Sequence, residues 1–268
     1  MTDLSEKFRK YLSRNAIINT IRLESTLESK TEQTIKYLFS LNDGSRIETV
    51  SMVDGSRHTV CLSSQVGCSL DCDFCATAKM GFTRNLSTGE IIDQLLYVQN
   101  HVEEAVTNVV FMGMGEPFLN YDRVLKSADI FHDPRGLNMG ANRITISTVG
   151  ILPRIKQFIK ERRKYKLAIS LNAPDDEIRN KIMPINKKWK IEGIIKAGMA
   201  FSNLKRKQIM FEYVLLKGIN DSAVDAKNLS FLLKNVQCKL NIIPYNETDG
   251  EYLRPGDNSI NEFLKILN

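Results

Sequence analysis

The 268-residue sequence has no apolar run long enough to cross a bilayer. Its first residues, Met-Thr-Asp-Leu-Ser-Glu-Lys, contain neither an apolar segment nor a cleavage site of the kind that a secretory leader needs. Long linkers, low-complexity tracts and internal repeats are also missing. These absences predict a cytoplasmic protein without membrane contact. The length and a 43% hydrophobic content predict one large domain with a full core and a small extension.

Metal-binding and disulfide patterns are scarce outside one short segment. The three histidines, His58, His101 and His132, show no ligand spacing, which predicts structural roles. The five cysteines do not form a disulfide framework, because three of them fall within eight residues. This distribution favours a reducing compartment.

That segment reads Cys-Ser-Leu-Asp-Cys-Asp-Phe-Cys and places Cys68, Cys72 and Cys75 at a CxxxCxxC spacing. Three thiolates so close together could hold zinc or an iron–sulfur cluster. A closed zinc site needs four ligands, usually as two separated pairs, and no second pair follows in the sequence. A [4Fe-4S] cluster on three thiolates leaves one iron open to another ligand. The spacing therefore favours a catalytic cluster over zinc.

From residue 58 onward, strand-like runs alternate with helical ones, a pattern typical of βα units and a parallel sheet. Right-handed crossovers would curl six units into an open (β/α)6 barrel, with function at the carboxyl ends of the strands. The expected strands are 58–62, 108–112, 143–147, 166–171, 208–215 and 239–243. The expected helices are 88–103, 121–132, 152–161, 176–182, 191–203, 223–234 and 259–267, the first with a Ser87–Glu90 capping box.

The segment before this alternation has a different pattern. Residues 4–14 predict a short amphipathic helix, and two strand-like runs, 34–41 and 46–53, flank Asn42-Asp43-Gly44, a hairpin signal. We therefore expect residues 1–56 to form a helix and β-hairpin extension, and residues 57–268 to form the barrel.

Polar and small residues follow successive predicted strands. Met112 to Pro117 reads Met-Gly-Met-Gly-Glu-Pro, where glycines allow close backbone approach to a ligand and Glu116 could accept from an ammonium group. Ser147-Thr148, Ser170 to Pro174 and Pro244 to Asn246 could hydrogen-bond a ribose or a base. Each of these segments alone is typical of a turn or cap, but their recurrence predicts one binding site.

The charge is basic, with lysine and arginine exceeding acids by six and a pI near 9.0. Such an excess suits a polyanionic partner without proving one. Residues 187–190, Lys-Lys-Trp-Lys, combine cations with an aromatic ring. This combination suits phosphate contact and base stacking, and it is equally typical of a solvated helix end. Residues 161–166 and 205–207 form two further basic clusters and leave the same two interpretations open.

Several motifs together resemble the RlmN/Cfr family of radical S-adenosylmethionine (SAM) methyltransferases. The segments that carry the resemblance are Cys61 to Cys75, Gly81 to Leu86, Phe111 to Pro117, Ile144 to Gly150, Met183 to Lys187 and Glu212 to Asp221. The resemblance runs from about Leu4 to the last residue. It implies methylation of an adenine in large-subunit ribosomal RNA at carbon 2 or 8, or in transfer RNA, by a cytoplasmic monomer. The implied cofactors are a [4Fe-4S] cluster and SAM, with an electron donor such as flavodoxin or ferredoxin.

Site roles follow from the same resemblance. Glu48 matches a proton acceptor, and Cys61 matches the cysteine that resolves a covalent intermediate. Without the resemblance, a solvated strand glutamate and a core cysteine would be expected at these positions. The positions that match cluster ligands are Cys68, Cys72 and Cys75, and those that match SAM contacts are Gly115, Glu116, Ser147, Ser170, Leu171, Asn172 and Asn246.

Two departures from the family pattern keep alternatives open. Asn172 stands where the family usually has histidine. The family also carries its methyl group on a cysteine beyond the last helix, and this sequence ends before that segment, as it also begins after the family's N-terminal accessory domain. Cys238 remains, and its position at a strand start predicts packing. The alternatives are a tail-less relative that uses the 5′-deoxyadenosyl radical directly on a nucleotide, peptide or other small substrate, and a non-catalytic RNA-binding relic.

Overall fold

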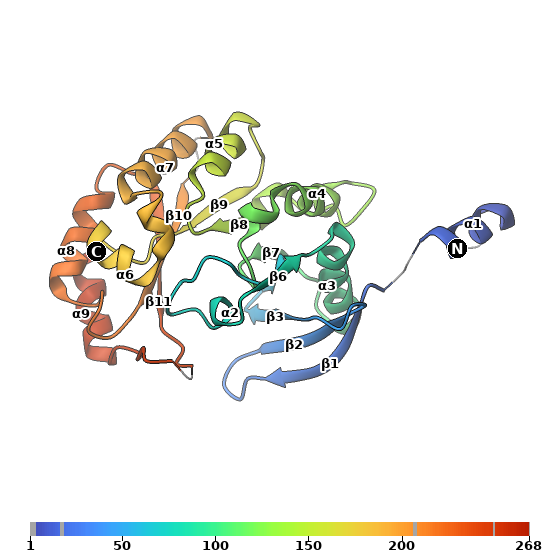
Figure 1. Cartoon of the computed structure of the whole chain (residues 1–268), viewed down its shortest axis with the longest axis horizontal. Helices are drawn as coiled ribbons and strands as arrows, with labels where there is room; N and C mark the ends of the chain where they lie inside the picture. The colour runs from blue at the N-terminus through green and yellow to red at the C-terminus, as the bar shows by residue number, and fades with distance from the viewer. Residues whose placement is uncertain (1–3, 17–18, 206–207, 249, 268) are drawn as a thin grey trace.

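The computed structural model describes residues 4–16, 19–205, 208–248 and 250–267, and Figure 1 shows their arrangement. Within these ranges a nine-stranded sheet has the order β1-β2-β3-β4-β7-β8-β9-β10-β11, and β5 and β6 form a separate pair. The strands are β1 (Ile21–Glu28), β2 (Thr34–Leu41), β3 (Arg46–Asp54), β4 (Arg57–Cys61), β5 (Gln65–Gly67), β6 (Phe82–Asn85), β7 (Asn108–Phe111), β8 (Ile144–Thr148), β9 (Lys166–Ser170), β10 (Ile209–Leu215) and β11 (Cys238–Pro244).

The six strands from β4 to β11 in this order are parallel, which confirms the predicted open barrel sheet. Figure 1 shows the helices from α3 to α9, except α6, in an arc around the outside of this curved sheet. The helices are α1 (Glu6–Asn15), α2 (Ala76–Lys79), α3 (Thr88–His101), α4 (Tyr121–His132), α5 (Leu152–Lys160), α6 (Asp176–Ile182), α7 (Ile191–Lys205), α8 (Ala223–Leu233) and α9 (Asp257–Leu267). Every predicted helix is present, and the Ser87–Glu90 capping box at the start of α3 is confirmed.

The N-terminal strands form the antiparallel part of the sheet. The hairpin predicted at Asn42-Asp43-Gly44 is confirmed: Gly44 has φ +82°, and Ser45 N donates to Asp43 Oδ1 over 2.9 Å. β1 was not predicted, because its residues are mostly polar and exposed, and it is held by its pairing with β2. β3 pairs directly with β4, so the extension continues the barrel sheet; the division at residue 56 stays a prediction.

One hydrophobic core spans both parts of the sheet. Tyr37 and Phe39 of β2 pack their rings edge-on against Tyr97 of α3, and the same buried cluster continues to Phe263 of α9. Because the outer face is filled by helices, polar groups gather on the inner face and at the carboxyl ends of the strands. No helix in the described part of the chain is long and apolar enough to cross a membrane.

Candidate active site

The three clustered cysteines lie on a loop that joins the β5–β6 pair. Cys68 N donates to Gly81 O over 2.9 Å, and Cys75 N donates to Cys72 O over 3.0 Å, so the loop closes on itself. Gly67, with φ +71°, sits where the two ends of the loop cross, and a Cβ there would lie 1.7 Å from Gly81 O. Only glycine allows this crossing, which fixes where the first cysteine points.

Contacts from distant segments hold the outer part of the loop. Asp73 N donates to Ile182 O of α6 over 3.0 Å, and Asp73 Oδ2 accepts from Tyr252 Oη over 2.6 Å. Tyr245 Oη donates to Phe74 O over 3.2 Å. These bonds place the loop inside the curve of the sheet, between α6 and the residues that follow β11 (Figure 1).

The environment of the thiols suits a cluster more than a single ion. Burial raises the pKa of Cys68 to about 11 and that of Cys72 further, and the neighbouring cysteines raise both. The thiolates therefore need a strong positive centre, which iron supplies. Among the described residues, no three Cys, His, Asp or Glu side chains converge tightly enough to hold one metal ion. A [4Fe-4S] cluster takes its thiolates on separate iron atoms, which suits three cysteines of one loop, and the role of Cys68, Cys72 and Cys75 as its ligands stays a prediction.

Glu48 and Cys61 lie on the same face of the sheet. Cys61 ends β4 and pairs with Val50 of β3, so their side chains share a face. Glu48, two residues from Val50, points to that face as well. Ser63 Oγ donates to Glu48 O over 2.5 Å, and Glu48 Oε1 accepts from Lys36 Nζ over 3.3 Å. Glu48 therefore stands at the carboxyl edge of the parallel strands with its carboxylate half-exposed.

A buried glutamate on β10 connects two predicted SAM-binding serines. Glu212 Oε2 accepts from Ser147 Oγ over 2.8 Å and from Ser170 Oγ over 3.2 Å. Burial raises the pKa of Cys61 to about 12, and the charge of Glu212 adds to this rise. No site role was predicted for Glu212, although it begins one of the segments that resemble the family. A charged residue inside a strand of otherwise apolar character was the signal that could have found it.

The Gly-Met-Gly-Glu segment after β7 packs against the chain that follows β4. A Cβ on Gly113 would lie 2.9 Å from the Leu62 backbone, and one on Gly115 would lie 2.4 Å from Gln65 Cβ. Met114 O accepts from Gln65 N over 3.2 Å. The expected close approach is therefore present, but in the described structure it is made to another part of the chain.

Glu116 is buried and already has backbone partners. Its Oε1 accepts from Phe118 N and its Oε2 from Val149 N, each over 2.9 Å, while Glu116 N donates to Gln65 Oε1 over 2.8 Å. Burial raises its pKa to about 7, although the two amides favour its charged form. The carboxylate joins the ends of β7 and β8, and its predicted contact with SAM stays a prediction.

This pKa predicts a pH-dependent contribution of Glu116 to stability. The folded-state pKa, about 7, exceeds the ordinary 4.5, so the folded chain binds the extra proton between these values. The contribution is fully present below the ordinary pKa and is lost as pH rises through 7, with a slope of at most about 1.4 kcal/mol per pH unit. Urea unfolding of the cluster-free chain from pH 5 to 8 should show wild type losing stability relative to Glu116→Gln. Parallel profiles would contradict this.

The remaining predicted SAM contacts differ in accessibility. Asn172, at the position where the family usually has histidine, has φ +57°. Its Oδ1 accepts from Val214 N over 2.9 Å, so this side chain binds β10 in the described structure. Leu171 is fully buried beside it, and its N donates to Glu212 O over 2.9 Å. Asn246 is exposed, just beyond β11. All three lie at the carboxyl edge, and their contacts with SAM stay predictions.

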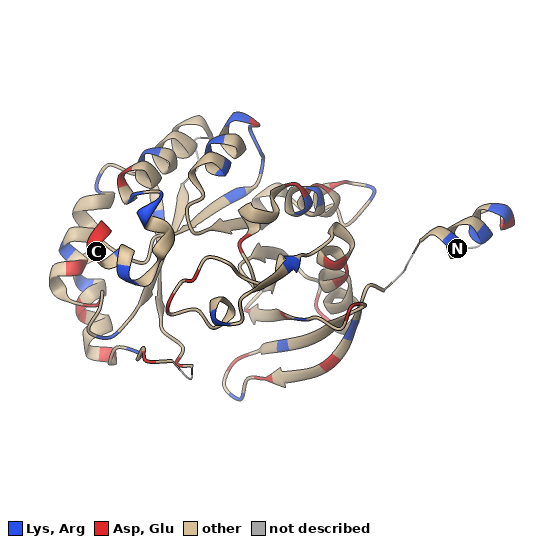
Figure 2. Ribbon diagram, in the orientation of Figure 1, with Lys and Arg blue, Asp and Glu red and all other residues tan. Residues whose placement is uncertain are grey.

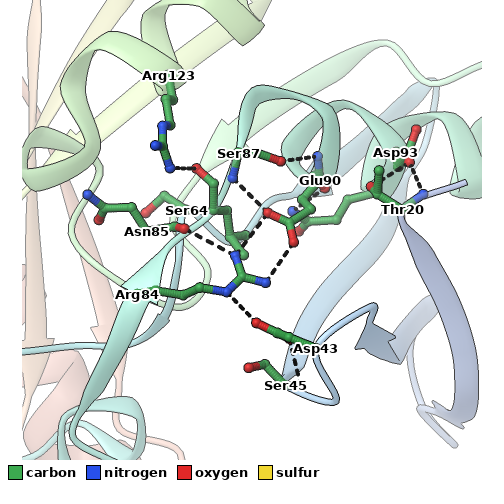
Figure 3. A network of polar contacts seen from close by, with 12 residues as sticks. Thr20, Asp43, Ser45, Ser64, Arg84, Asn85, Ser87, Glu90, Asp93 and Arg123 are labelled. Atoms are coloured by element: carbon green, nitrogen blue, oxygen red, sulfur yellow. Dashed lines mark hydrogen bonds and ion pairs between the residues drawn. The ribbon is translucent and has the colours of Figure 1, made fainter. Parts of the chain in front are cut away.

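Arg84 connects the cysteine loop to the N-terminal hairpin (Figure 3). Its guanidinium donates to both Glu90 oxygens over 3.0 and 2.7 Å, and to Asp43 Oδ2 over 2.5 Å. Burial disfavours the charged form of Glu90, but the bonds from Arg84 and Ser87 outweigh this effect and lower its pKa. One side chain thus joins β6, the start of α3 and the β2–β3 turn. No role was predicted for this arginine, which belongs to the segment Gly81 to Leu86 that resembles the family.

We expect Arg84→Ala to lower the free energy of unfolding by about 1–3 kcal/mol, because it leaves the buried Glu90 carboxylate without its cation. Arg46→Ala is the matched control. Arg46 pairs with Glu24, but its side chain is 64% exposed. Exposed pairs contribute at most about 1 kcal/mol. Equal losses in the two variants, measured by urea unfolding, would contradict a structural role of Arg84 beyond a surface pair.

Of the basic clusters, two can be placed. Residues 161–166 lie at the amino ends of the strands, away from the cysteine loop. In this cluster Arg163 forms ion pairs with Glu161 and Asp129, and Tyr165 is buried. Residues 187–190 lie between α6 and α7, and Lys188 Nζ lies 4.8 Å from the centre of the Trp189 ring. Residues 206 and 207 and the side chain of Lys205 lie outside the described part. Figure 2 shows basic and acidic residues interspersed over the outer helices.

The histidines have structural partners, as predicted. His58 Nε2 lies 2.7 Å from Ser51 Oγ, and its Nδ1 lies 3.1 Å from Glu104 O. His101 and His132 each bond a backbone carbonyl through Nδ1. None of them belongs to the cysteine loop.

Comparisons with known proteins agree with this geometry. The sequence matches the Radical SAM superfamily over residues 62–228. The probable dual-specificity RNA methyltransferase RlmN of Pseudothermotoga lettingae is 41% identical over 267 residues, covering 100% of this chain and 78% of that protein. The dual-specificity RNA methyltransferase RlmN of Geotalea uraniireducens is 42% identical, covering 100% and 77%. A radical SAM methyltransferase from Sphaerobacter thermophilus superposes with a TM-score of 0.94 at 39% identity, covering 99% of this chain and 79% of that one.

The open parallel sheet and the three-cysteine loop inside its curve define the class of protein, and the chain belongs to the Radical SAM superfamily. Membership of this superfamily implies a [4Fe-4S] cluster and SAM. Because the matches to RlmN proteins extend over the whole chain, it belongs, within that superfamily, to the RlmN family. The predicted family and fold class are thereby confirmed.

Proposed function

We propose that this protein methylates an adenine of ribosomal or transfer RNA, with Cys68, Cys72 and Cys75 as ligands of a [4Fe-4S] cluster. The observation that carries the proposal is the identity of about 41% to RNA methyltransferases over the full chain. The RNA substrate, the electron donor of the flavodoxin or ferredoxin type and a monomeric state belong to the proposal.

The chain's own residues have separable roles in this proposal. When bound, the cluster and SAM supply a 5′-deoxyadenosyl radical by reductive cleavage. Ser147, Ser170 and the residues after β7 would orient SAM at the carboxyl ends of the strands. Glu48, half-exposed at the same edge, would accept the proton that leaves the adenine ring, and Cys61 would release the product by forming a disulfide. The common face of Glu48 and Cys61 supports this pairing of roles.

The family scheme also needs a cysteine that carries the methyl group, and Cys238 does not suit that role. It begins β11 and pairs with Ile209 at the start of β10, so it lies at the amino ends of the strands. The cysteine loop lies at the opposite ends. Burial raises the pKa of its thiol, which also makes it a poor nucleophile. Cys238 is best explained by packing, and the proposal assigns it no chemistry.

The test is anaerobic. The chain is reconstituted with iron and sulfide, reduced, and given SAM labelled in its methyl group, with and without 23S ribosomal RNA or transfer RNA. Formation of 5′-deoxyadenosine with labelled adenine in the RNA would support the proposal. Formation of 5′-deoxyadenosine with unlabelled RNA would mean a working radical source whose methyl carrier is missing or whose substrate is something else. RNA binding without SAM cleavage would favour a non-catalytic protein.

A further inference from the structure

Arg179 of α6 is the largest fully buried side chain among the described residues, with 0% exposure. Its Nε donates to Leu171 O over 2.9 Å, and its Nη2 donates to Val149 O over 2.6 Å and Ser170 O over 3.1 Å. Its Nη1 donates to Asn186 Oδ1 over 2.9 Å. The guanidinium therefore clamps the carboxyl ends of β8 and β9, where SAM contacts are predicted.

All four of these partners are neutral. Within the described residues, no salt bridge joins Arg179 to a carboxylate. The nearby Asp176 uses its Oδ1 to accept from Ile191 N over 3.0 Å and from Asn186 Nδ2 over 2.8 Å. Burial lowers the pKa of Arg179 to about 10, which still leaves it charged at neutral pH. A buried charge without an ionic partner is costly, and it persists where something else compensates it.

The cysteine loop lies against the end of α6, where Asp73 N, next to Cys72, donates to Ile182 O, three residues from Arg179. Cys72 belongs to the same buried cluster as Ile182, the last residue of α6, and Met183. A cluster with three thiolate ligands is negative and becomes more negative on reduction. A fixed buried cation beside it therefore favours the reduced form.

We propose that Arg179 is a positioning residue with an electrostatic role: its buried cation stabilises the reduced cluster while its four hydrogen bonds fix the strand ends. The inference rests on the proposed cluster at Cys68, Cys72 and Cys75. It does not depend on RNA being the substrate.

The test measures the midpoint potential of the reconstituted cluster by redox titration followed by electron paramagnetic resonance, in Arg179→Lys and Arg179→Gln. Lysine keeps the charge. At a given potential, the ratio of reduced to oxidised cluster in Arg179→Lys should therefore stay within threefold of the wild-type ratio. Glutamine keeps a donor but no charge, so that ratio should fall at least tenfold at a given potential, a shift of about 59 mV for one electron. Lys181→Met is the control: it removes a cation from the same helix, but one that is 67% exposed. Its potential should not change.

Wild-type potentials in both Arg179 variants would overturn the proposal, and so would equal shifts in both, because charge would then not be the cause. If Arg179→Gln holds no cluster, a lowered potential in Arg179→Lys, which keeps the charge, would overturn the proposal. The readout needs no RNA and no turnover. A wild-type chain that binds no cluster would instead contradict the proposed function.

Discussion

Cys72→Ala is expected to abolish both the brown absorbance of the reconstituted cluster and the formation of 5′-deoxyadenosine. Cys72 is the most buried of the three loop cysteines, at 7% exposure, and packs between α6 and the residues after β11. The other two described cysteines do not belong to the loop: Cys61 ends β4, and Cys238 lies at the opposite ends of the strands. Two thiolates would leave two irons without protein ligands. Iron content, absorbance and product formation measure the loss.

Cys238→Ala is the matched control, because it removes another partly buried thiol of the same chain. It should retain the cluster and SAM cleavage, with a stability loss that reflects packing alone. Retention of the cluster and of SAM cleavage in Cys72→Ala would disprove the central assignment of this site. Loss of the cluster in Cys238→Ala would show that the assay reports general unfolding. Far-ultraviolet circular dichroism of both variants separates these outcomes.

The parallel half of the fold could be predicted because its strands are short apolar runs between amphipathic helices. β1 could not, because its burial is confined to Ile21 and its order comes from pairing with β2. β5 and β6 are three and four residues long, too short to show a period. In each of these strands the tertiary partner decides the structure, and a local pattern does not reveal that partner.

The site could be predicted as a set of residues, but the directions of their side chains could not. The glycines after β7 were expected to approach a ligand, and the structure shows them against the segment after β4. Glu116 was expected to face an ammonium group and binds two amides. Ser147 and Glu212 are 65 residues apart in sequence, and only the strand order brings them into contact. A sequence identifies which polar residues end a strand, but the register decides what each of them meets.

The glycine segment offers the second large effect. Gly115→Ala is expected to lower the free energy of unfolding by about 2–5 kcal/mol. About 1–2 kcal/mol comes from placing a Cβ at φ +92°, and about 1–3 kcal/mol from overpacking against Gln65, whose Cβ would lie 2.4 Å away. Relieving this contact requires a shift of Gln65 or of the backbone next to Glu116, and Gln65 Oε1 accepts from Glu116 N, so either shift disturbs Glu116. We therefore expect SAM binding to be lost along with stability.

Gly218→Ala separates the two costs. Gly218 also has a positive φ, +72°, but nothing lies within 4 Å of the position its Cβ would take. This variant should lose only about 1–2 kcal/mol, the conformational part, and should bind SAM as wild type does. Urea unfolding gives the two free energies, and equilibrium dialysis with labelled SAM gives the affinities. If Gly115→Ala loses no more stability than Gly218→Ala and keeps its affinity for SAM, then the close approach to Gln65 does not position this segment. A larger loss in Gly115→Ala would mean that the packing of one chain segment on another, rather than backbone freedom alone, sets the position of Glu116 at the strand ends.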